Sequence, residues 1–240
     1  MKRLLCLLSA LLSLCLLSAC AQEACGGLIP DGTPLPGRVV RLYEDSLLLA
    51  GSEGGVYTAS PTEETLAGLR EGDLVTLYYS GVILETFPAQ LGQVEVVADQ
   101  TGFDDLCVLY RQVLEDLWGE DAALNDGITQ LGVDLSQSGL SQSEQSALAW
   151  AFAGEHGLPA IEGTWQELAD QGYIDGENLY WEDGMLFSIR TEQDAGEPGL
   201  VFTAEKWRSG TGAYFFCDCT STQDKHGHWS DYTVGAFAIS

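Results

Sequence analysis

The chain has 240 residues, of which 45% are hydrophobic and six are tryptophan, enough for one large or two small packed domains. Its formal net charge is -26, from 36 acidic and 10 basic residues. Such a charge repels phosphate backbones and anionic head groups, so it argues against nucleic acid as a partner and leaves divalent cations, basic peptides and neutral sugars.

A secretory leader opens the chain. Lys2 and Arg3 precede an apolar run of Leu, Ser and Ala that is shorter than the ~20 residues of a membrane-spanning helix. The run ends in Leu17–Cys20, with the sequence Leu-Ser-Ala-Cys, which resembles the lipobox that lipoprotein signal peptidase cuts before its cysteine. We therefore expect a signal peptide over 1–19, acyl chains on Cys20, and a lipid-anchored protein on the extracytoplasmic face of the cell membrane.

The segment after the lipidated cysteine is rich in Gly and Pro, and it predicts a spacer over 20–36. Beyond Cys20, the cysteines are Cys25, Cys107, Cys217 and Cys219. Disulfide frameworks are usually denser and belong to smaller secreted domains, so we expect no disulfide to hold this fold together.

Residues 37–99 show the alternation of β-strands. Strands are predicted at 38–43, 47–50, 56–59, 74–79 and 93–98. Between the third and fourth, Ser60–Glu63 predicts a short helix, with Ser60 as its N-cap and Pro61 at its first position. Three strands, a short helix and two strands are the order of the OB-fold, a small Greek-key barrel, with an SH3-like barrel as the alternative.

Two sequence features extend this reading to a family. Glu71-Gly72-Asp73 precedes a strand, and Gly81–Gln90 then reads Gly-Val-Ile-Leu-Glu-Thr-Phe-Pro-Ala-Gln. Together they resemble a small domain of unknown function that is common in exported lipoproteins of Gram-positive bacteria. The resemblance covers about 37–98 and implies an extracytoplasmic β-barrel, with no assigned chemistry.

Residues 104–240 predict helices followed by strands, after a linker at 99–103. A helix is expected from about Leu106, capped by Asp104 or Asp105 and ended by Gly119, and the stretch 124–135 is expected to be a loop. Ser141–Glu144 and Thr164–Glu167 are capping boxes that open two more helices. Strands are predicted at 178–181, 185–191, 200–207, 213–219 and 229–239.

The expected fold class is therefore α+β: an N-terminal small OB-like β-barrel, then helices followed by an antiparallel β-meander. The second part is similar to modules of uncharacterised exported proteins, for which no function is implied.

One cluster carries metal-ligand residue types: Cys217, Cys219, His226 and His228. Strand alternation would place the two thiols on one face, and a hairpin would bring the imidazoles opposite them. Such a set suits Zn²⁺ or Cu⁺. The spacing matches no zinc motif, however, and the alternative makes both cysteines small core residues and both histidines polar turn residues.

Catalytic signals are weak. His156 lies near a helix C-terminus, where contact with the last carbonyls is expected, and the chain has no Gly-x-Ser-x-Gly elbow. An Asp/Glu pair for glycoside hydrolysis cannot be selected among 36 acidic residues. No enzyme and no cofactor are therefore expected.

Aromatic residues exceed what two small cores need. They either stack on sugar rings, as in OB barrels that bind oligosaccharides, or seal the interface between the two domains. The set comprises Tyr78, Tyr79, Phe87, Trp181, Trp207, Tyr214 and Trp229.

Together these features predict a lipid-anchored binding or interaction module at the cell envelope. Its partners would be the membrane, through the lipid on Cys20, and a protein or glycan ligand. A metal-handling lipoprotein using the Cys/His hairpin is the alternative, and an envelope hydrolase is the third reading.

Overall fold

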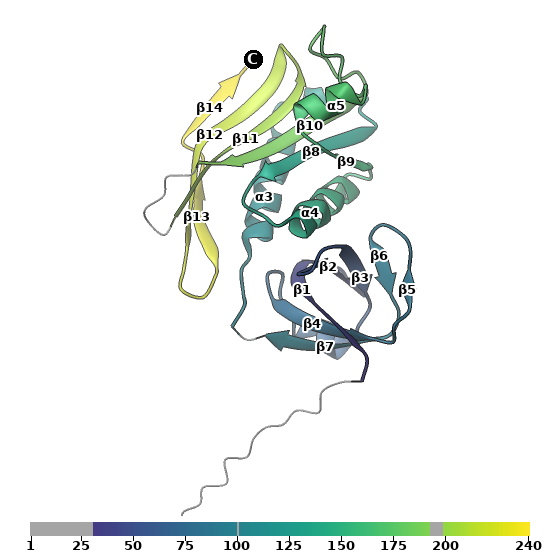
Figure 1. Cartoon of the computed structure of the whole chain (residues 1–240). Helices are drawn as coiled ribbons and strands as arrows, with labels where there is room; N and C mark the ends of the chain where they lie inside the picture. Colours follow the sequence, from purple (N-terminus) through teal and green to yellow (C-terminus); the bar gives the residue numbers. More distant parts are fainter. Residues whose placement is uncertain (1–30, 100, 193–198) are drawn as a thin grey trace, which may run out of the picture. The chain divides into compact units, whose positions relative to one another are not determined.

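The structure, a computed structural model, describes residues 31–99, 101–192 and 199–240 (Figure 1). The predicted signal peptide 1–19, Cys20 and the spacer up to residue 30 lie outside these ranges. Across the described ranges, no helix is both long enough and apolar enough to cross a membrane.

The first sheet contains seven strands and one short helix, α2 (Glu63–Ala67). The strands pair antiparallel, except for β3 with β6, which pair parallel. They are β1 (Thr33–Leu42), β2 (Leu47–Gly51), β3 (Val56–Ala59), β4 (Leu74–Tyr79), β5 (Ile83–Leu84), β6 (Ala89–Leu91) and β7 (Val94–Asp99).

This sheet does not close into a hydrogen-bonded barrel within the described residues. Its strand order is β5-β6-β3-β2-β1-β4-β7, an open path. Only Gly92 and Gln93 separate β6 from β7 in the sequence, although β6 pairs with β3 and β7 pairs with β4. The closed form of the predicted OB-like barrel is therefore not observed. The predicted three strands, short helix and strands at 74–79 and 93–98 are present, but β5 and β6, which were not predicted, lie between the last two.

Two local details of this region differ from the sequence prediction. β1 begins at Thr33, inside the predicted spacer, and its first half pairs only with β4. Such a one-sided position tolerates Pro34 and Pro36, which the sequence reading took as spacer residues. The N-cap of α2 is Thr62 and not Ser60: its hydroxyl accepts a hydrogen bond from the Thr65 amide.

The second sheet has the order β13-β12-β11-β10-β8-β9, and β14 also pairs with β12. Its helices are α3 (Leu106–Gly119), α4 (Gln142–Glu155), α5 (Trp165–Asp170) and the 3-10 turn η1 (Ala122–Asn125). Its strands are β8 (Gln130–Gln137), β9 (Ala160–Glu162), β10 (Gly184–Thr191), β11 (Gly199–Ser209), β12 (Gly212–Gln223), β13 (Trp229–Thr233) and β14 (Ala236–Ile239).

The predicted α+β class holds in its coarse form, with two sheets and several helices, but the predicted order of elements is wrong in the second half. The stretch 124–135, expected to be a loop, contains most of β8, which pairs parallel with both β9 and β10. β8 is buried on both faces, so its sequence shows no alternation of apolar and polar residues. The antiparallel meander begins only at β10. The predicted strand 178–181 reduces to isolated bridges at Tyr180.

The two faces of the second sheet pack against different helices. Phe187 and Ile189 of β10 lie in one hydrophobic cluster with residues of α3 and α4. Leu186, which points the other way, lies in a second cluster with Leu168 of α5 and the fully buried Trp181. The two clusters therefore place α4 and α5 on opposite faces of the parallel strands, which follow each other in the chain order β8-α4-β9-α5-β10.

Local signals and one distant side chain fix the helix ends. Both predicted capping boxes are present, at Ser141–Glu144 and Thr164–Glu167. The predicted end of α3 at Gly119 is also confirmed. Beyond it, the fully buried Lys206 of β11 donates to the carbonyl oxygens of Trp118 at 3.2 Å and Glu120 at 2.6 Å. A lysine here satisfies carbonyls that a helix C-terminus leaves without partners.

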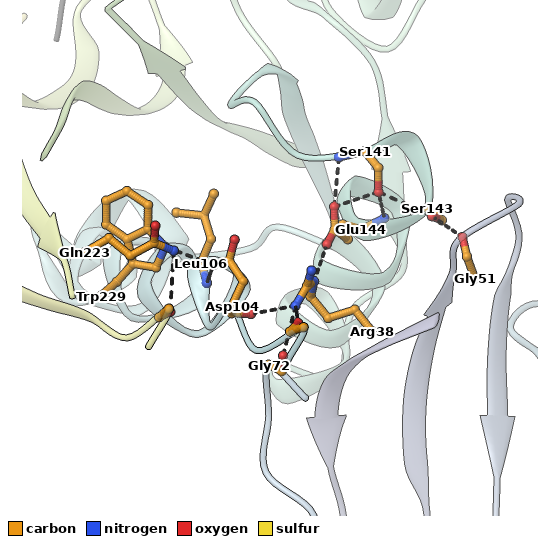
Figure 2. A network of polar contacts seen from close by, with 12 residues as sticks. Arg38, Gly51, Gly72, Asp104, Leu106, Ser141, Ser143, Glu144, Gln223 and Trp229 are labelled. Carbon is orange, nitrogen blue, oxygen red and sulfur yellow. Dashed lines mark hydrogen bonds and ion pairs between the residues drawn. The ribbon is translucent and has the colours of Figure 1, made fainter. Parts of the chain in front are cut away.

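A polar network connects β1 to the N-terminus of α4 (Figure 2). Arg38 donates through Nε to Oε1 of Glu144 at 2.9 Å, and through one terminal nitrogen to the carbonyls of Gly72 and Gly102, both at 2.9 Å. Ser143 donates to the carbonyl of Gly51 at 2.8 Å. Apolar residues of the first sheet also join the α3/α4 cluster: Val40, Leu48, Ala50 and Val56. The domain boundary at 99–103 stays a prediction.

Candidate functional site

A row of polar side chains crosses the second sheet on the face that carries α5. Asp134 of β8 pairs in register with Ser188 of β10, which pairs with Glu205 of β11. Asp134 is 8% exposed and Ser188 is 3% exposed. Since the neighbouring residues in these strands point into the α3/α4 cluster, alternation places all three polar side chains on the opposite face. Glu205 is half-buried. Two buried polar residues beside a half-buried one are unusual in a face that serves packing alone.

Hollows lie at both ends of this row. The first, of about 270 Å³, is formed where β8 and β9 end and α4 and α5 begin. Its lining includes Asp134, Ser136, Gln145, Glu162, Thr164 and Glu167. The second, of about 280 Å³, is lined by Ser188, Arg190, Thr203 and Glu205 among others. The carboxyl ends of parallel strands, next to helices on opposite faces, are where ligands of α/β sheets commonly bind.

The electrostatics of the row favour ligands that donate hydrogen bonds. Burial raises the pKa of Glu205, and Asp134 adds to this rise, while Arg190 at 3.5 Å opposes it. Oδ1 of Asp134 accepts from the Ser136 amide at 3.1 Å and the Ser136 hydroxyl at 2.6 Å. A carboxylate has about four acceptor positions, so these bonds leave capacity for a ligand. The first hollow has no basic residue in its lining.

The structure does not bring the four predicted metal-ligating side chains together. Across the described ranges, no three His, Cys, Asp or Glu side chains form a group that could hold a metal ion. Asp218 has a φ of 52°, and the β11–β12 register shifts beside it, so the strand alternation assumed for the two thiols is interrupted. Cys219 is fully buried, and burial raises its pKa to about 12, whereas Cys217 is half-buried.

The two histidines have separate environments. His226 lies in the β12–β13 turn, where its amide donates to Oδ1 of Asp224 at 2.7 Å. Nδ1 of His228 lies 3.2 Å from Oδ2 of Asp105, and the Trp229 amide donates to the same carboxylate at 2.7 Å. Asp105, predicted as a possible helix cap, makes no capping bond and instead attaches this hairpin to the start of α3.

His156 is the C-cap of α4, as its position near a helix C-terminus predicted, and its backbone amide donates to the carbonyl of Ala153 at 3.1 Å. Its ring stacks on Trp118 with centroids 3.8 Å apart, and its Nε2 lies 3.2 Å from Oε1 of Glu115. These side-chain contacts add to the predicted contact with the last carbonyls of the helix, which the backbone amide makes. Burial lowers the pKa of His156.

The aromatic residues do not form one exposed platform. Trp181 is fully buried and Trp207 is 9% exposed, both in the cluster under α5. Phe87 is 61% exposed, on the first sheet. The remaining members of the set, Tyr78, Tyr79, Tyr214 and Trp229, are half-buried. Their arrangement gives no support to a sugar-stacking surface made from these seven residues.

Comparison with known proteins adds no relative: no family model matches the chain, and no curated protein matches its sequence.

The sequence pattern did not predict the polar row of Asp134, Ser188 and Glu205. Its one local signal is Asp134, a charged residue between Val133 and Leu135 in an apolar stretch. Its partners Ser188 and Glu205 come from strands more than 50 residues further along the chain.

Proposed function

We propose that this chain is a lipid-anchored, extracytoplasmic binding module, and that the polar row of Asp134, Ser188 and Glu205 is its ligand site. The single observation that supports this site is the row itself: polar side chains in register across three strands, flanked by two hollows. Each hollow has the volume of a small polar molecule, near the lower end of ordinary ligand pockets.

The ligand that best fits this site carries hydroxyl or amino groups. Ionised carboxylates only accept hydrogen bonds, and the first hollow combines three of them, Asp134, Glu162 and Glu167, with the amides of Gln142 and Gln145. Anionic groups would be repelled there. We therefore propose a neutral or cationic polyol or amine, such as one sugar unit of a glycan.

Titration with three related sugars tests this chemistry. Glucosamine is cationic, N-acetylglucosamine is neutral and glucuronate is anionic at neutral pH. Amide shifts of the mature chain should change near Asp134 with the first two sugars and not with the third. Asp134→Asn should weaken the cationic sugar most. Glu53→Gln, an exposed acid in a turn of the first sheet, is the matched control and should have no effect. Absence of shifts near Asp134 with all three sugars would refute the site.

The anchoring half of the proposal is supported by the Leu-Ser-Ala-Cys sequence ending at Cys20. In a host that processes lipoproteins, Cys20→Ala should leave an uncut precursor without acyl chains. Labelling with a palmitate analogue tests this directly. Label on the Cys20→Ala protein would show that the lipid is attached elsewhere.

We also propose that the first sheet is an open relative of the OB-like barrel. The parallel pairing of β3 with β6 and the short link from β6 to β7 support this. The continuous segment β6–β7 pairs with β3 through β6 and with β4 through β7, although β2 and β1 separate β3 from β4 in the strand order. The family resemblance of 37–98 remains a proposal of the same kind.

The metal-handling alternative has a direct test in elemental analysis of the mature protein, purified without chelators or a polyhistidine tag. About one zinc or copper per chain, lost in a Cys217→Ser/Cys219→Ser variant, would replace the proposal above with a metal-handling function. We expect trace metal only, since no metal-holding group is assembled in the described part of the chain.

A further inference from the structure

Strands β5 and β6 form a hairpin in the first sheet (Figure 1). This hairpin carries the most concentrated group of exposed apolar side chains of that sheet. We call this group the apolar tip. It consists of Val82, Ile83, Leu84 and Phe87, with exposed fractions of 57%, 38%, 55% and 61%. Single exposed apolar residues are ordinary, but a contiguous group marks an interaction surface.

The backbone of the tip is held in place by its own hydrogen bonds. The Thr86 amide donates to the carbonyl of Leu84 at 2.8 Å, and the Thr86 hydroxyl donates to the carbonyl of Pro88 at 2.7 Å. Ile83 and Leu84 pair with β6. A surface that is already folded loses little conformational freedom when it binds.

The tip also lies in a long, sparsely charged stretch of an acidic chain. From Leu74 to Val94 the sequence contains one charged residue, Glu85, although the whole chain has 36 acidic residues. A long uncharged stretch lowers the cost of bringing this region against an apolar phase.

The position of the tip relates it to the lipid. Thr33, the first residue of β1, pairs with Tyr79, and the tip begins three residues after Tyr79. Cys20 is 13 positions before Thr33, a length of chain that spans at most about 45 Å. A lipid on Cys20 would therefore keep this end of the first sheet within reach of the bilayer.

We propose that the apolar tip docks on the surface of the bilayer in which the lipid of Cys20 is anchored. This inference rests on the anchoring part of the proposed function. The docking surface would be an uncharged one, because Glu85 in the hairpin, with Asp31 and Glu95 in a neighbouring hollow, disfavours anionic head groups. Docking would hold the chain against the membrane beside its tether.

The test uses the mature chain with Cys20→Ala, so that no acyl chain contributes to binding. Its partition onto phosphatidylcholine vesicles is measured by co-flotation. Phe87→Ser should reduce the partition coefficient by about tenfold, because it removes a large apolar side chain from the contact. Phe237→Ser is the matched control, since Phe237 is also 61% exposed but lies on β14 of the second sheet. Adding phosphatidylglycerol at low salt should weaken binding.

Several results would overturn the inference. No binding of the unlipidated chain to phosphatidylcholine, or an equal loss with Phe87→Ser and Phe237→Ser, would exclude docking through the tip. Light scattering that shows a dimer which Phe87→Ser dissociates would assign the tip to a second copy of the chain. Palmitate labelling of Cys20 tests the anchor separately, so a failure of the tip and a failure of the anchor are distinguishable.

Discussion

Replacing Arg38 by methionine should destabilise the whole chain, since its guanidinium is shared by three segments. It bonds to Glu144 at the start of α4, to Gly72 before β4 and to Gly102 before α3. Methionine keeps much of the aliphatic stem but removes every donor. The Glu144 carboxylate, 18% exposed, would keep only its bonds within the capping box.

The expected magnitude follows from burial. Breaking a fully buried ion pair by removing one partner costs about 3–5 kcal/mol, and an exposed pair costs about 0–1 kcal/mol. The side chain of Arg38 is 21% exposed, which places it nearer the buried limit, so we expect a loss of about 3 kcal/mol. With a urea dependence of about 3 kcal/mol per molar for a chain of this size, the unfolding midpoint should fall by about 1 M.

Urea unfolding followed by tryptophan fluorescence measures this change. Arg190→Met is the control: its ion pair with Glu205 spans 3.5 Å and its side chain is 55% exposed, so its midpoint should fall far less. Equal midpoints for the two variants would refute the reasoning, because the network would then contribute no more than an exposed pair.

Three further predictions concern other parts of the chain. Burial raises the pKa of Glu115 from 4.5 to about 7, so the native state binds a proton that the unfolded chain releases, and stability falls as pH rises through this window. Glu115→Gln should therefore raise the melting temperature above pH 7 more than at pH 4.5; an equal effect at both would contradict this. Gly132→Ala should lower stability by about 1–3 kcal/mol, since its Cβ would lie 2.6 Å from the Trp181 ring, whereas Gly154→Ala in α4 meets open space and should be neutral or stabilising in the same urea assay. The fragment 36–99 should fold alone with dispersed amide signals but unfold at lower urea than the whole chain, because it loses the cover of α4; a fragment without dispersed signals would place the domain boundary elsewhere.

Local sequence signals predicted local structure well. The capping boxes at Ser141 and Thr164 and the end of α3 at Gly119 depend on residues within one turn of each other, so the sequence contains all the necessary information. β8 was missed because its strand partners β9 and β10 follow it in the chain. In addition, the clusters around α3/α4 and α5 cover both faces of the sheet, which removes the alternation that marks a strand. The first part of β1, from Thr33 to Pro36, was missed because prolines usually indicate a spacer.

Predicting the candidate site would have required the pairing of strands that lie far apart in the sequence. Strand register alone places Ser188 between Asp134 and Glu205, and no pattern within one strand indicates that row. The Cys/His cluster failed for a related reason: the left-handed backbone at Asp218 interrupts the alternation that was assumed for Cys217 and Cys219. A bulge at an aspartate is a local feature, but the sequence gives it no distinctive signature.

The contact of the buried Lys206 with the end of α3 affects the order in which the parts of the chain can fold during synthesis. Every strand of the first sheet finds its partners within residues 33–99, so that sheet can pair before the second half of the chain exists. The carbonyl of Glu120, by contrast, waits for a donor that is made 86 residues later, and β8 waits for β10. A chain emerging from the ribosome therefore carries an unpaired β8 edge until β10 is made, and the end of α3 lacks its lysine donor until β11 is made. During that interval, the apolar strand β8 is the segment that most needs protection from aggregation.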